Sequence, residues 1–331
     1  MSRPTLADVA DRAGVSLKTA SRAMNGEYGV APATAERVLE AARSLGFRPN
    51  LLARSLASGR PSAAVGLVIP NVADPFFAEL VGGVERTLEP RDLQLVIASH
   101  HDDAVGQRKI VRALVDRRVD ALLLVPAPGD VSYLRLDIDH GLVVVSLDRP
   151  VVGVDVDTVI VDNRRASTAA VRELIVAGHR RIALLADNPR LWTMQERTTG
   201  YRLALAEAGI AEDPALVHLD CPTPEAARTA IAAVLSLDDP PTAVFAAHNA
   251  TGRELVRAAR AAAVDLPLVV FDETSDSDLL IVPPQVLRSN PDRLGTTAAA
   301  MALERLDGLT APSRLVIHPV SRVTPASWAA A

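Results

Sequence analysis

The stretch TLADVADRAGVSLKTASRAMN, residues 5–25, decides how the N-terminal part folds, because it carries the signals of two short helices joined by a turn. Thr5 is a good N-cap, and Asp8 three residues later forms a variant of the capping box. Gly14 supplies the left-handed residue that commonly ends a helix, and Ser16 can cap a second helix. This arrangement is the helix-turn-helix pattern, whose second helix enters the DNA major groove. By itself, the stretch is equally compatible with two amphipathic helices of some bundle.

The residues that follow favour the DNA-binding alternative. A third helix is predicted over residues 30–45, with Gly46 as its stop signal. Residues 1–60 contain nine Arg and Lys against five Asp and Glu, whereas the remainder of the chain has 26 against 35. A basic head on an acidic body is typical of one phosphate-binding module attached to a body that does not bind DNA. Short segments also fluctuate in charge by chance, so this is support and not proof.

Length and composition limit the class of protein. The chain has 331 residues, too many for one ordinary core, so two or three domains are expected. Its single cysteine, Cys221, rules out an internal disulfide and a cysteine-based metal cluster. No run approaches the roughly 18 uninterrupted apolar residues of a membrane span, and the N-terminus has no apolar signal-peptide core. We therefore expect a soluble, cytoplasmic protein.

From residue 64 onward, strands and helices alternate. VGLVIP at 65–70 is a continuous apolar run typical of a buried parallel strand, and Asp74-Pro75 can begin a helix. Further strands are expected at 93–99, 121–125, 143–147, 158–161, 182–186, 216–219, 243–246, 268–271, 285–288 and 315–320. Helices are expected at 107–117, 166–177, 198–208, 224–235, 252–262 and 291–306. Eleven strands in two similar runs predict two doubly wound lobes with parallel sheets, which bind ligands at the carboxyl ends of their strands.

Two N-terminal segments, TLADVADRAGVSLKTASRAMNG and AERVLEAARSLGFRPNLLARSLASGR, closely resemble the N-terminus of the LacI family of bacterial transcription repressors. Body motifs such as VGLVIPNVADPFFAEL, VVVSLDRP, ERTTGYRLALAEAG and VLRSNPDRLG extend the resemblance to about residue 325. Departures are small: Ala20 replaces the usual Val, and Ala31 stands where a capping Ser is common.

The resemblance implies an all-α helix-turn-helix head and an α/β body like the periplasmic sugar-binding proteins, with two doubly wound parallel-sheet lobes. The head would span residues 1–49, a hinge helix and linker 50–60, and the effector-binding and dimerisation domain 61–331. Within that domain, lobe 1 would comprise about 61–161 and 291–320, and lobe 2 about 162–290 and 321–331.

The resemblance also implies which residues contact DNA. Three positions on the second helix would read bases: Leu17, Lys18 and Arg22. Five would mostly hold the phosphate backbone: Leu6, Ser16, Thr19, Ser21 and Asn25. In the hinge, with Ala53 and Arg54, Leu56 would wedge into the minor groove of the operator. The alternatives are a surface salt bridge for Arg22 and a buried helix position for Leu56.

Nothing in the sequence indicates an enzyme or a cofactor. There is no G-x-G-x-x-G after a strand, no G-x-x-x-x-G-K-[ST] and no G-x-S-x-G. The run His100-His101-Asp102-Asp103 has adjacent histidines rather than an i, i+4 pair. We interpret it as a solvated loop, and we expect no metal.

Polar and aromatic residues at strand ends would line a cleft and hold a small effector, often a sugar or nucleobase in the family. The expected effector residues are Phe76, Phe77, Asp148, Arg149, Trp192, Arg197, His248, Asn249 and Asp272. Aromatic planes stack on apolar ring faces, and carboxylate, amide and guanidinium groups fix hydroxyls. Alternatives remain: core packing for Phe77, mutual pairing of Asp148 with Arg149, and an interlobe salt bridge between Arg197 and Asp272. The family often has Asn-Asp at the position of His248-Asn249, which leaves the effector class open.

The sequence therefore predicts a homodimeric repressor, possible also as a tetramer, that binds a near-palindromic DNA operator and is controlled by a small-molecule effector of the carbohydrate class. The C-terminal VTPASWAAA has no leucine heptad, which argues weakly against a tetramer. Three rivals remain: a repressor controlled by a protein partner, a solute-binding protein and a sugar-processing enzyme. Effector identity, inducer against corepressor, operator sequence and dimer against tetramer stay open.

Overall fold

The computed structural model describes residues 4–25, 28–47, 63–262, 266–272 and 284–323. The chain divides into two compact units, Met1–Ser62 and Ala63–Ala331. We describe each unit by itself. The expected hinge residues Ala53, Arg54 and Leu56 lie outside the described residues.

The first unit contains three helices around a small core. These are α1 (Leu6–Ala13), α2 (Leu17–Met24) and α3 (Pro32–Leu45). The Thr5 hydroxyl accepts a hydrogen bond from the backbone N–H of Asp8. In return, the Asp8 carboxylate accepts a hydrogen bond from the backbone N–H of Thr5, so the predicted capping box is present. Gly14 has φ 64°, the left-handed conformation that a turn between two helices needs here.

Small side chains bring the three helices of the head together. The buried core consists of Val9, Ala10, Ala20, Ala23, Val38, Ala41 and Ala42. Ala31, where a capping hydroxyl was missing from the sequence, forms no side-chain cap bond, and α3 begins directly with Pro32. A backbone N–H at this first position would have no acceptor within the helix. Proline, which has no N–H, therefore costs no hydrogen bond here. The helix therefore begins two residues later than the predicted residue 30.

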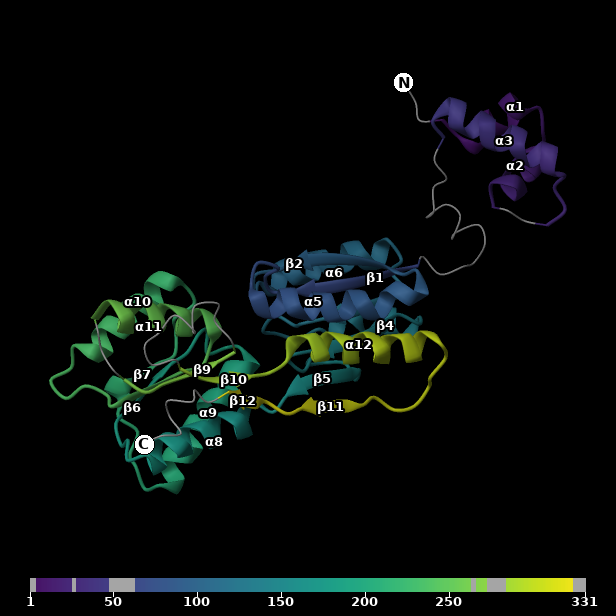
Figure 1. The fold of residues 1–331 in the computed structure, drawn as a ribbon. Coiled ribbons are helices and arrows are strands. Elements are labelled where there is room, and N and C mark those ends of the chain that lie inside the picture. Colours follow the sequence, from purple (N-terminus) through teal and green to yellow (C-terminus); the bar gives the residue numbers. More distant parts are fainter. Residues whose placement is uncertain (1–3, 26–27, 48–62, 263–265, 273–283, 324–331) are drawn as a thin grey trace. The chain divides into compact units, whose positions relative to one another are not determined.

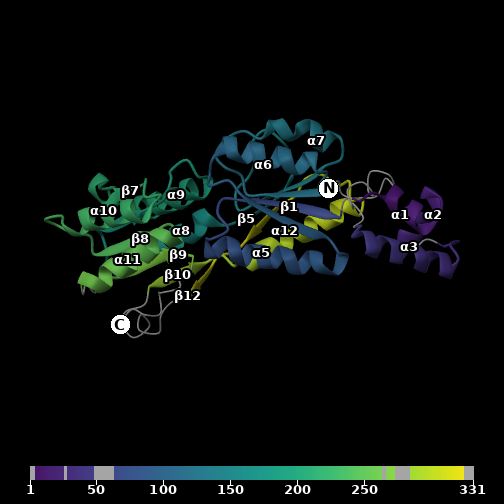
Figure 2. The same ribbon diagram turned by 90° about the horizontal axis from the view of Figure 1, so that it is seen from above.

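The second unit consists of two lobes, and the first is built on a six-stranded parallel sheet. Its strands are β1 (Ala64–Ile69), β2 (Gln94–Ser99), β3 (Ala121–Leu124), β4 (Val143–Leu147), β5 (Asp157–Val161) and β11 (Leu315–His318), in the order β11-β5-β4-β3-β1-β2. Helices α5 (Pro75–Leu88) and α12 (Pro291–Leu306) pack on one face. Helix α6 (Ala104–Asp116) and the short α7 (Arg135–Asp139) lie on the other face (Figures 1 and 2).

The second lobe repeats this plan. Its strands are β6 (Ile182–Leu185), β7 (Val217–His218), β8 (Ala243–Ala246), β9 (Leu268–Phe271), β10 (Gln285–Arg288) and β12 (Ser321–Val323), in the order β12-β10-β9-β8-β6-β7. Helices α8 (Asn163–Val176) and α9 (Trp192–Glu207) cover one face. Helices α10 (Pro224–Leu235) and α11 (Asn249–Ala262) cover the other. Three 3-10 turns complete the described elements: Glu89–Arg91, Ser132–Leu134 and Pro214–Leu216.

The largest departures from the sequence prediction concern one strand and the start of one helix. The described residues contain twelve strands where eleven were predicted, and β12 pairs antiparallel with β10, so the second sheet is not wholly parallel. All three residues of β12 are exposed, and they lack the apolar pattern that reveals a buried strand. Helix α9 begins at Trp192, six residues before the predicted residue 198, and its N-cap Leu191 provides no side-chain signal.

The chain passes between the two sheets three times: after β5, after β10 and after β11. The segments that follow β5 and β10 begin with a capped helix. Asp162 caps α8, and Asn290 in a left-handed conformation caps α12. Among the described residues, no helix has the length and apolar character needed to cross a membrane.

Candidate functional site

The head presents one face of α2 to solvent. Leu17 is 54% exposed, Lys18 is exposed and Arg22 is partly exposed, whereas Ala20 and Ala23 are buried on the opposite side of the helix. The Arg22 guanidinium donates to the backbone oxygen of Tyr28 in the turn after α2. One short helix therefore presents the guanidinium of Arg22, the ammonium of Lys18 and the apolar side chain of Leu17. Arginine and lysine can donate to guanine, and leucine can pack on a thymine methyl group in the major groove.

The other expected DNA residues of the head have local structural roles as well. Leu6 packs against the core of the head. The Ser16 hydroxyl caps α2 by accepting from the Thr19 backbone N–H at 3.1 Å, and the two hydroxyl groups lie 2.8 Å apart. Asn25 is the C-cap of α2, and Ser21 is half-buried on the same helix.

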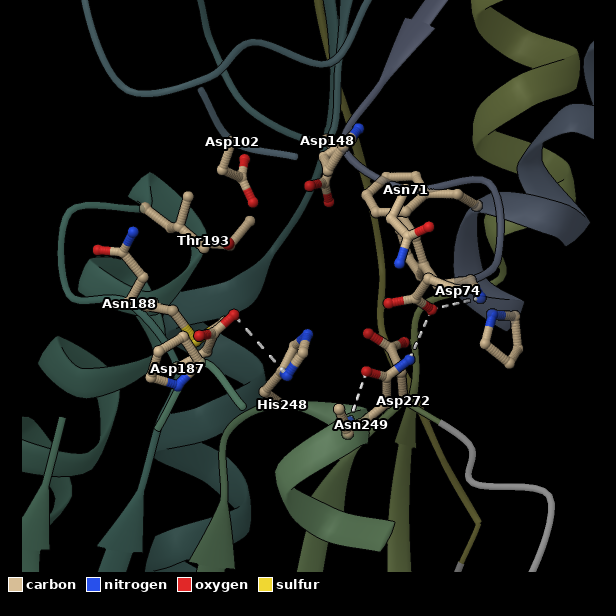
Figure 3. Close-up of a pocket in the computed structure, with 18 of the residues that line it drawn as sticks. Asn71, Asp74, Asp102, Asp148, Asp187, Asn188, Thr193, His248, Asn249 and Asp272 are labelled. Atoms are coloured by element: carbon tan, nitrogen blue, oxygen red, sulfur yellow. Dashed lines mark hydrogen bonds and ion pairs between the residues drawn. The ribbon is translucent and has the colours of Figure 1, made fainter. Parts of the chain in front are cut away.

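In the second unit, residues from both lobes line a cavity of about 450 Å³ (Figure 3). Polar segments follow the carboxyl ends of strands β1, β2 and β4 in the first lobe and of β6, β8 and β9 in the second. Doubly wound sheets bind ligands at this edge, because the strand ends leave a crevice that loop residues can line. The cavity is lined by eight of the nine expected effector residues: Phe76, Phe77, Asp148, Arg149, Arg197, His248, Asn249 and Asp272.

The ninth expected residue, Trp192, is not among those that line the cavity. It is the first residue of α9 and half-buried, where the sequence predicted a loop. Because the helix begins earlier than predicted, its next residues Thr193 and Met194 lie at the cavity instead. The expectation that Trp192 contacts the effector therefore has no support in this geometry.

On the lobe 1 wall, Arg149 forms the centre of a buried ionic cluster. Its Nη1 donates to the Asp102 carboxylate and to the Pro126 carbonyl at 3.1 Å, and its Nε lies 3.4 Å from Asp148. Burial raises the pKa of Asp148, while the nearby Arg149 and Arg197 act to lower it. Asp148 and Arg149 form an ion pair with each other, as one of the alternatives expected. Both residues also line the cavity.

On the lobe 2 wall, Arg197 is buried among acceptors. Its Nε donates to Asn163 at 2.8 Å and its Nη1 to the Ala247 carbonyl at 2.7 Å, while its Nη2 lies 3.5 Å from Asp272. The guanidinium also stacks 3.5 Å from the centre of the Phe271 ring. Because α9 and β9 belong to the same lobe, the Arg197–Asp272 pair lies within lobe 2, and the interlobe alternative is wrong.

The two phenylalanines belong to the core and to the cavity at once. Phe76 and Phe77 are 9% and 7% exposed, and their rings meet edge to face with centres 5.0 Å apart. Both pack in the main core of lobe 1. They add aromatic surface to a cavity that both apolar and polar side chains line.

A direct hydrogen bond joins the two lobes at the cavity. The Asn249 amide donates to the Asp74 carboxylate at 2.9 Å, and that carboxylate also accepts from the Phe76 backbone N–H at 2.9 Å (Figure 3). His248 precedes Asn249, and its Nδ1 lies 3.9 Å from Asp187. The ends of β1, β6 and β8 therefore meet through side chains.

The interpretation of residues 100–103 as a solvated loop is wrong for two of its residues. His100 is 3% exposed, with Nε2 2.9 Å from the Val125 carbonyl, and Asp102 lines the cavity through its pairing with Arg149. His101 and Asp102 both have left-handed φ angles, 52° and 56°. In the described part of the chain, no group of three or more His, Cys, Asp and Glu residues is placed to hold a metal ion.

Sequence reasoning missed eight polar or charged residues of the cavity: Asn71, Asp74, His101, Asp102, Asp187, Asn188, Thr193 and Arg253. Asp187 and Asn188 directly follow β6, so the rule that identified His248 and Asp272 also applies to them. Asp74 was recognised only as a helix cap. Asp102 could not be found in this way, because its approach to Arg149 depends on a contact 47 residues apart.

A helix-turn-helix head and a two-lobed body with a polar cavity between the lobes define the class of DNA-binding regulator with a small-molecule-binding domain. Residues 5–50 match the family model of bacterial regulatory proteins, lacI family. Residues 62–301 match that of periplasmic binding proteins and sugar binding domain of LacI family. The chain belongs to the LacI family.

The similar proteins are regulators. The chain is 32% identical over 328 residues to the HTH-type transcriptional regulator CelR of Thermobifida fusca, covering 96% of each chain. The structure of a CelR–cellobiose complex is 30% identical, with a TM-score of 0.71 over 97% of this chain and 99% of that one. The lac repressor dimer bound to operator and an anti-inducer is 23% identical with a TM-score of 0.78, covers 98% of both chains, and shares the fold. This protein is a DNA-binding transcriptional regulator and not an enzyme.

Proposed function

We propose that this regulator represses transcription from a near-palindromic operator and that a carbohydrate effector in the interlobe cavity controls its affinity for DNA. The observation that carries the proposal is the combination of two features on one chain. The head exposes Leu17, Lys18 and Arg22 on α2, and the body holds a polar cavity lined by both lobes. A ligand that contacts both lobes can bias the angle between them.

For DNA recognition, we assign base contacts to Leu17, Lys18 and Arg22. Contacts with the DNA backbone go to Leu6, Ser16, Thr19, Ser21 and Asn25. Contacts of this kind position the head on the DNA without reading its base sequence. The hinge, residues 50–60, follows the head of residues 1–49, and its Ala53, Arg54 and Leu56 would enter the minor groove. Wedging an apolar side chain between base pairs costs a few kcal/mol of unstacking, which the bend and added contacts offset.

For effector recognition, the cavity offers hydroxyl-binding groups and an apolar end. Asp148, Asn249, His248 and Asp272 can bind hydroxyls, and the phenylalanine pair can pack on the apolar face of a sugar ring. The complex of CelR with cellobiose supports a sugar as the effector class. Arg149 and Arg197 act chiefly by holding Asp102, Asp148 and Asp272 in position.

A two-fold symmetric dimer suits a near-palindromic operator, because each head reads one half-site. The first sheet has two edge strands that expose apolar side chains, Val96 and Ile97 on β2 and Leu315 and Ile317 on β11. Such edges are commonly covered in a folded assembly. We place the protein in the cytoplasm with the DNA that it binds, and a tetramer remains an open alternative.

Effector and operator binding would be coupled reciprocally. Coupling between sites is typically ~1–3 kcal/mol, and DNA must change effector affinity by the same factor as effector changes DNA affinity. The lobes' shared side-chain contact, Asn249 with Asp74, lies at the cavity, where a bound ligand would strengthen or replace it.

The test of this proposal compares Arg22→Ala with Arg43→Ala, an exposed arginine on α3. Arg22→Ala should weaken operator binding by more than about tenfold and relax sequence preference at one position, because a good base contact contributes ~1–3 kcal/mol. Effector binding should be unchanged. Arg43→Ala should retain sequence preference. Full operator affinity and preference in Arg22→Ala would contradict the assigned reading face.

The rival is a repressor controlled by a protein partner. Calorimetry against sugars such as cellobiose and against nucleobases separates the two. The carbohydrate proposal predicts heat with at least one sugar, whereas control by a protein partner predicts none with any metabolite.

A further inference from the structure

The cavity is lined by more carboxyl groups than guanidinium groups. It is lined by five carboxylates and three guanidiniums: Asp74, Asp102, Asp148, Asp187 and Asp272, and Arg149, Arg197 and Arg253. The two buried guanidiniums are already compensated, Arg149 by Asp102 and Asp148 and Arg197 by Asp272. Among the described residues, Asp74 and Asp187 also line the cavity and form no ion pair with an arginine, and Arg253 is the third guanidinium of the lining.

Asp187 and His248 form a second polar feature on the lobe 2 wall. They follow neighbouring strands β6 and β8, and Figure 3 shows the two side chains facing each other at the cavity. The Oδ1 atom of Asp187 and the Nδ1 atom of His248 are both buried and have no hydrogen-bond partner within the protein. A buried carboxylate oxygen and a buried ring nitrogen without partners are unfavourable, so a ligand that forms hydrogen bonds with them would bind favourably.

Asp148 presents a third acceptor. It is 4% exposed, adopts a left-handed φ of 62°, and its carboxylate points into the cavity in Figure 3. Its nearest cation is the Arg149 Nε at 3.4 Å, a nitrogen that has no well-aligned hydrogen-bond acceptor. Asp148 therefore retains acceptor capacity for a ligand.

Of the helix N-termini beside the cavity, those of α5 and α11 already carry side-chain acceptors, whereas that of α9 has no side-chain cap. Asp74 caps α5 by accepting from the Phe76 N–H, and the Asn249 side chain accepts from the Ala250 N–H at the start of α11. Each of these caps occupies one backbone donor that a phosphate or carboxylate group could use.

We propose that the effector is a hydroxyl-rich or amino sugar without an acidic group, and that Asp187, which lies beside His248, is the residue that enforces this choice. The inference rests on the proposed role of the cavity as the effector site. The free acceptors favour a ligand rich in hydrogen-bond donors. The excess of carboxylates repels a ligand that carries carboxylate or phosphate, and specificity follows from the difference between the two.

The experiment is calorimetry with ring-closed sugars that are matched except for one ionisable substituent. The probes are D-glucose, D-glucosamine and D-glucuronate, the corresponding D-galactose series, and cellobiose, at a pH where the amine is protonated. We expect the tightest binder to be a neutral or amino sugar, and its acidic counterpart to bind at least about tenfold more weakly, a factor of ten in affinity being ~1.4 kcal/mol. An acid that binds as tightly as its neutral counterpart, or a panel without any binding sugar, would overturn the proposal.

Asp187→Asn isolates the residue, with Asp116→Asn as the control because Asp116 is exposed on α6 and does not line this cavity. Asp187→Asn should reduce the preference for the neutral or amino sugar over the acid by at least about fivefold, since one like-charge repulsion is removed. Asp116→Asn should keep the wild-type preference. The Tm of the Asp187→Asn variant shows whether it is folded. If the folded variant keeps the wild-type preference, Asp187 is not the residue that rejects acidic sugars and the proposal is contradicted.

If Asp187→Asn does not fold, His248→Asn provides the second variant, because it removes the partner without removing a carboxylate. It should weaken binding of the preferred sugar while the rejection of acids persists, and loss of that rejection would contradict the role of Asp187. Failure of the proposed function is separable, because it shows in operator binding by the wild-type protein. Operator binding with no charge discrimination would refute this inference alone.

Discussion

At the scale of single residues, Asp157 at the start of β5 holds together segments of lobe 1 that are distant in the sequence. Its carboxylate accepts from Arg305 at the end of α12 and from Arg314 before β11, each at 2.8 Å. Burial opposes ionisation of this group, but the hydrogen bonds from the two arginines outweigh burial and lower the pKa of Asp157. The folded protein therefore binds a proton here less readily than the unfolded chain does.

Asp157→Asn should lower the free energy of unfolding at pH 7 by about 3 kcal/mol, because it leaves two arginines without their buried partner. Because the pKa of Asp157 is lower in the folded protein than in the unfolded chain, where it is about 4, its ionised form stabilises the fold at pH values above about 4. This contribution is lost as the pH falls below about 4. Denaturant unfolding of both proteins between pH 7 and pH 3 checks this. Asp307→Asn, in an exposed pair with Arg91, is the control and should change little. A difference between wild type and Asp157→Asn that stays constant over this range would contradict the account.

Asp148 is the opposite case, because burial raises its pKa. The folded state then binds the proton more tightly than the unfolded state, so its contribution to stability declines as the pH rises above about 4. Asp148→Asn should keep or raise the unfolding free energy at pH 7 and weaken effector binding by at least about tenfold. Thermal unfolding and calorimetry measure the two effects. A large loss of stability would show that the carboxylate is held by more than Arg149.

Backbone conformation also marks the cavity. Eight described residues other than glycine have positive φ angles, and four of them line this site: His101, Asp102, Asp148 and Asp272. Such conformations are costly and persist where surrounding structure enforces them. The chain accepts this strain where strand ends turn carboxylates and a histidine toward the cavity.

At the scale of elements, two glycines set the distance between α5 and α12. A Cβ atom on Gly83 would lie 2.1 Å from the backbone oxygen of Asp292. A Cβ atom on Gly295 would lie 2.1 Å from the backbone oxygen of Leu80. Backbone cannot yield as a flexible side chain can, so only glycine permits these helices to approach so closely.

Gly83→Ala should therefore lower the unfolding free energy by about 1–3 kcal/mol through overpacking. Its neighbour Gly82 provides a matched control, because a Cβ there meets only the flexible end of Arg86. Gly82→Ala should instead be neutral or stabilise by up to ~1 kcal/mol, since alanine favours a helix. Chemical denaturation measures both. Equal effects would show that helix propensity and not helix contact dominates.

Periodicity and cap signals were sufficient for most elements, and they failed where the chain gives no local signal. The bounds of β8 and α12 coincide with the predicted 243–246 and 291–306. The start of α9 was placed too late because Leu191 is not a capping residue, and this error led to the expectation for Trp192. β12 was missed because it is short and exposed.

The candidate site shows the same limit. Residues that directly follow buried strands, such as Asp148, His248 and Asp272, could be found from sequence and do line the cavity. Asp102 could not be found from the sequence, because its position at the cavity depends on an ion pair with Arg149. The hydrogen bond between Asn249 and Asp74, which are 175 positions apart, could not be predicted either. Long-range pairing is a property of the folded chain and leaves no local pattern.

At the scale of the whole molecule, the proposed dimer requires a covered surface. Ile97→Lys on β2 and Ile317→Lys on β11 test the two sheet edges, and Val176→Lys, at an exposed apolar residue at the end of α8, is the control. One of the two edge variants should weaken the dimer by at least about tenfold, because a lysine in an apolar interface must be desolvated. Sedimentation at several concentrations measures this. Dimers of unchanged affinity in both variants would place the interface elsewhere.

The central claim is that the head reads a specific operator and that a metabolite bound in the cavity controls this reading. The most direct test is selection of bound genomic fragments in vitro at one fixed salt concentration, since phosphate contacts make affinity salt-dependent. The selection is run with and without metabolites extracted from cells. We predict enrichment of a short palindrome with a flexible central step, and a change in that enrichment when the metabolites are added. No enriched sequence under either condition would contradict the account.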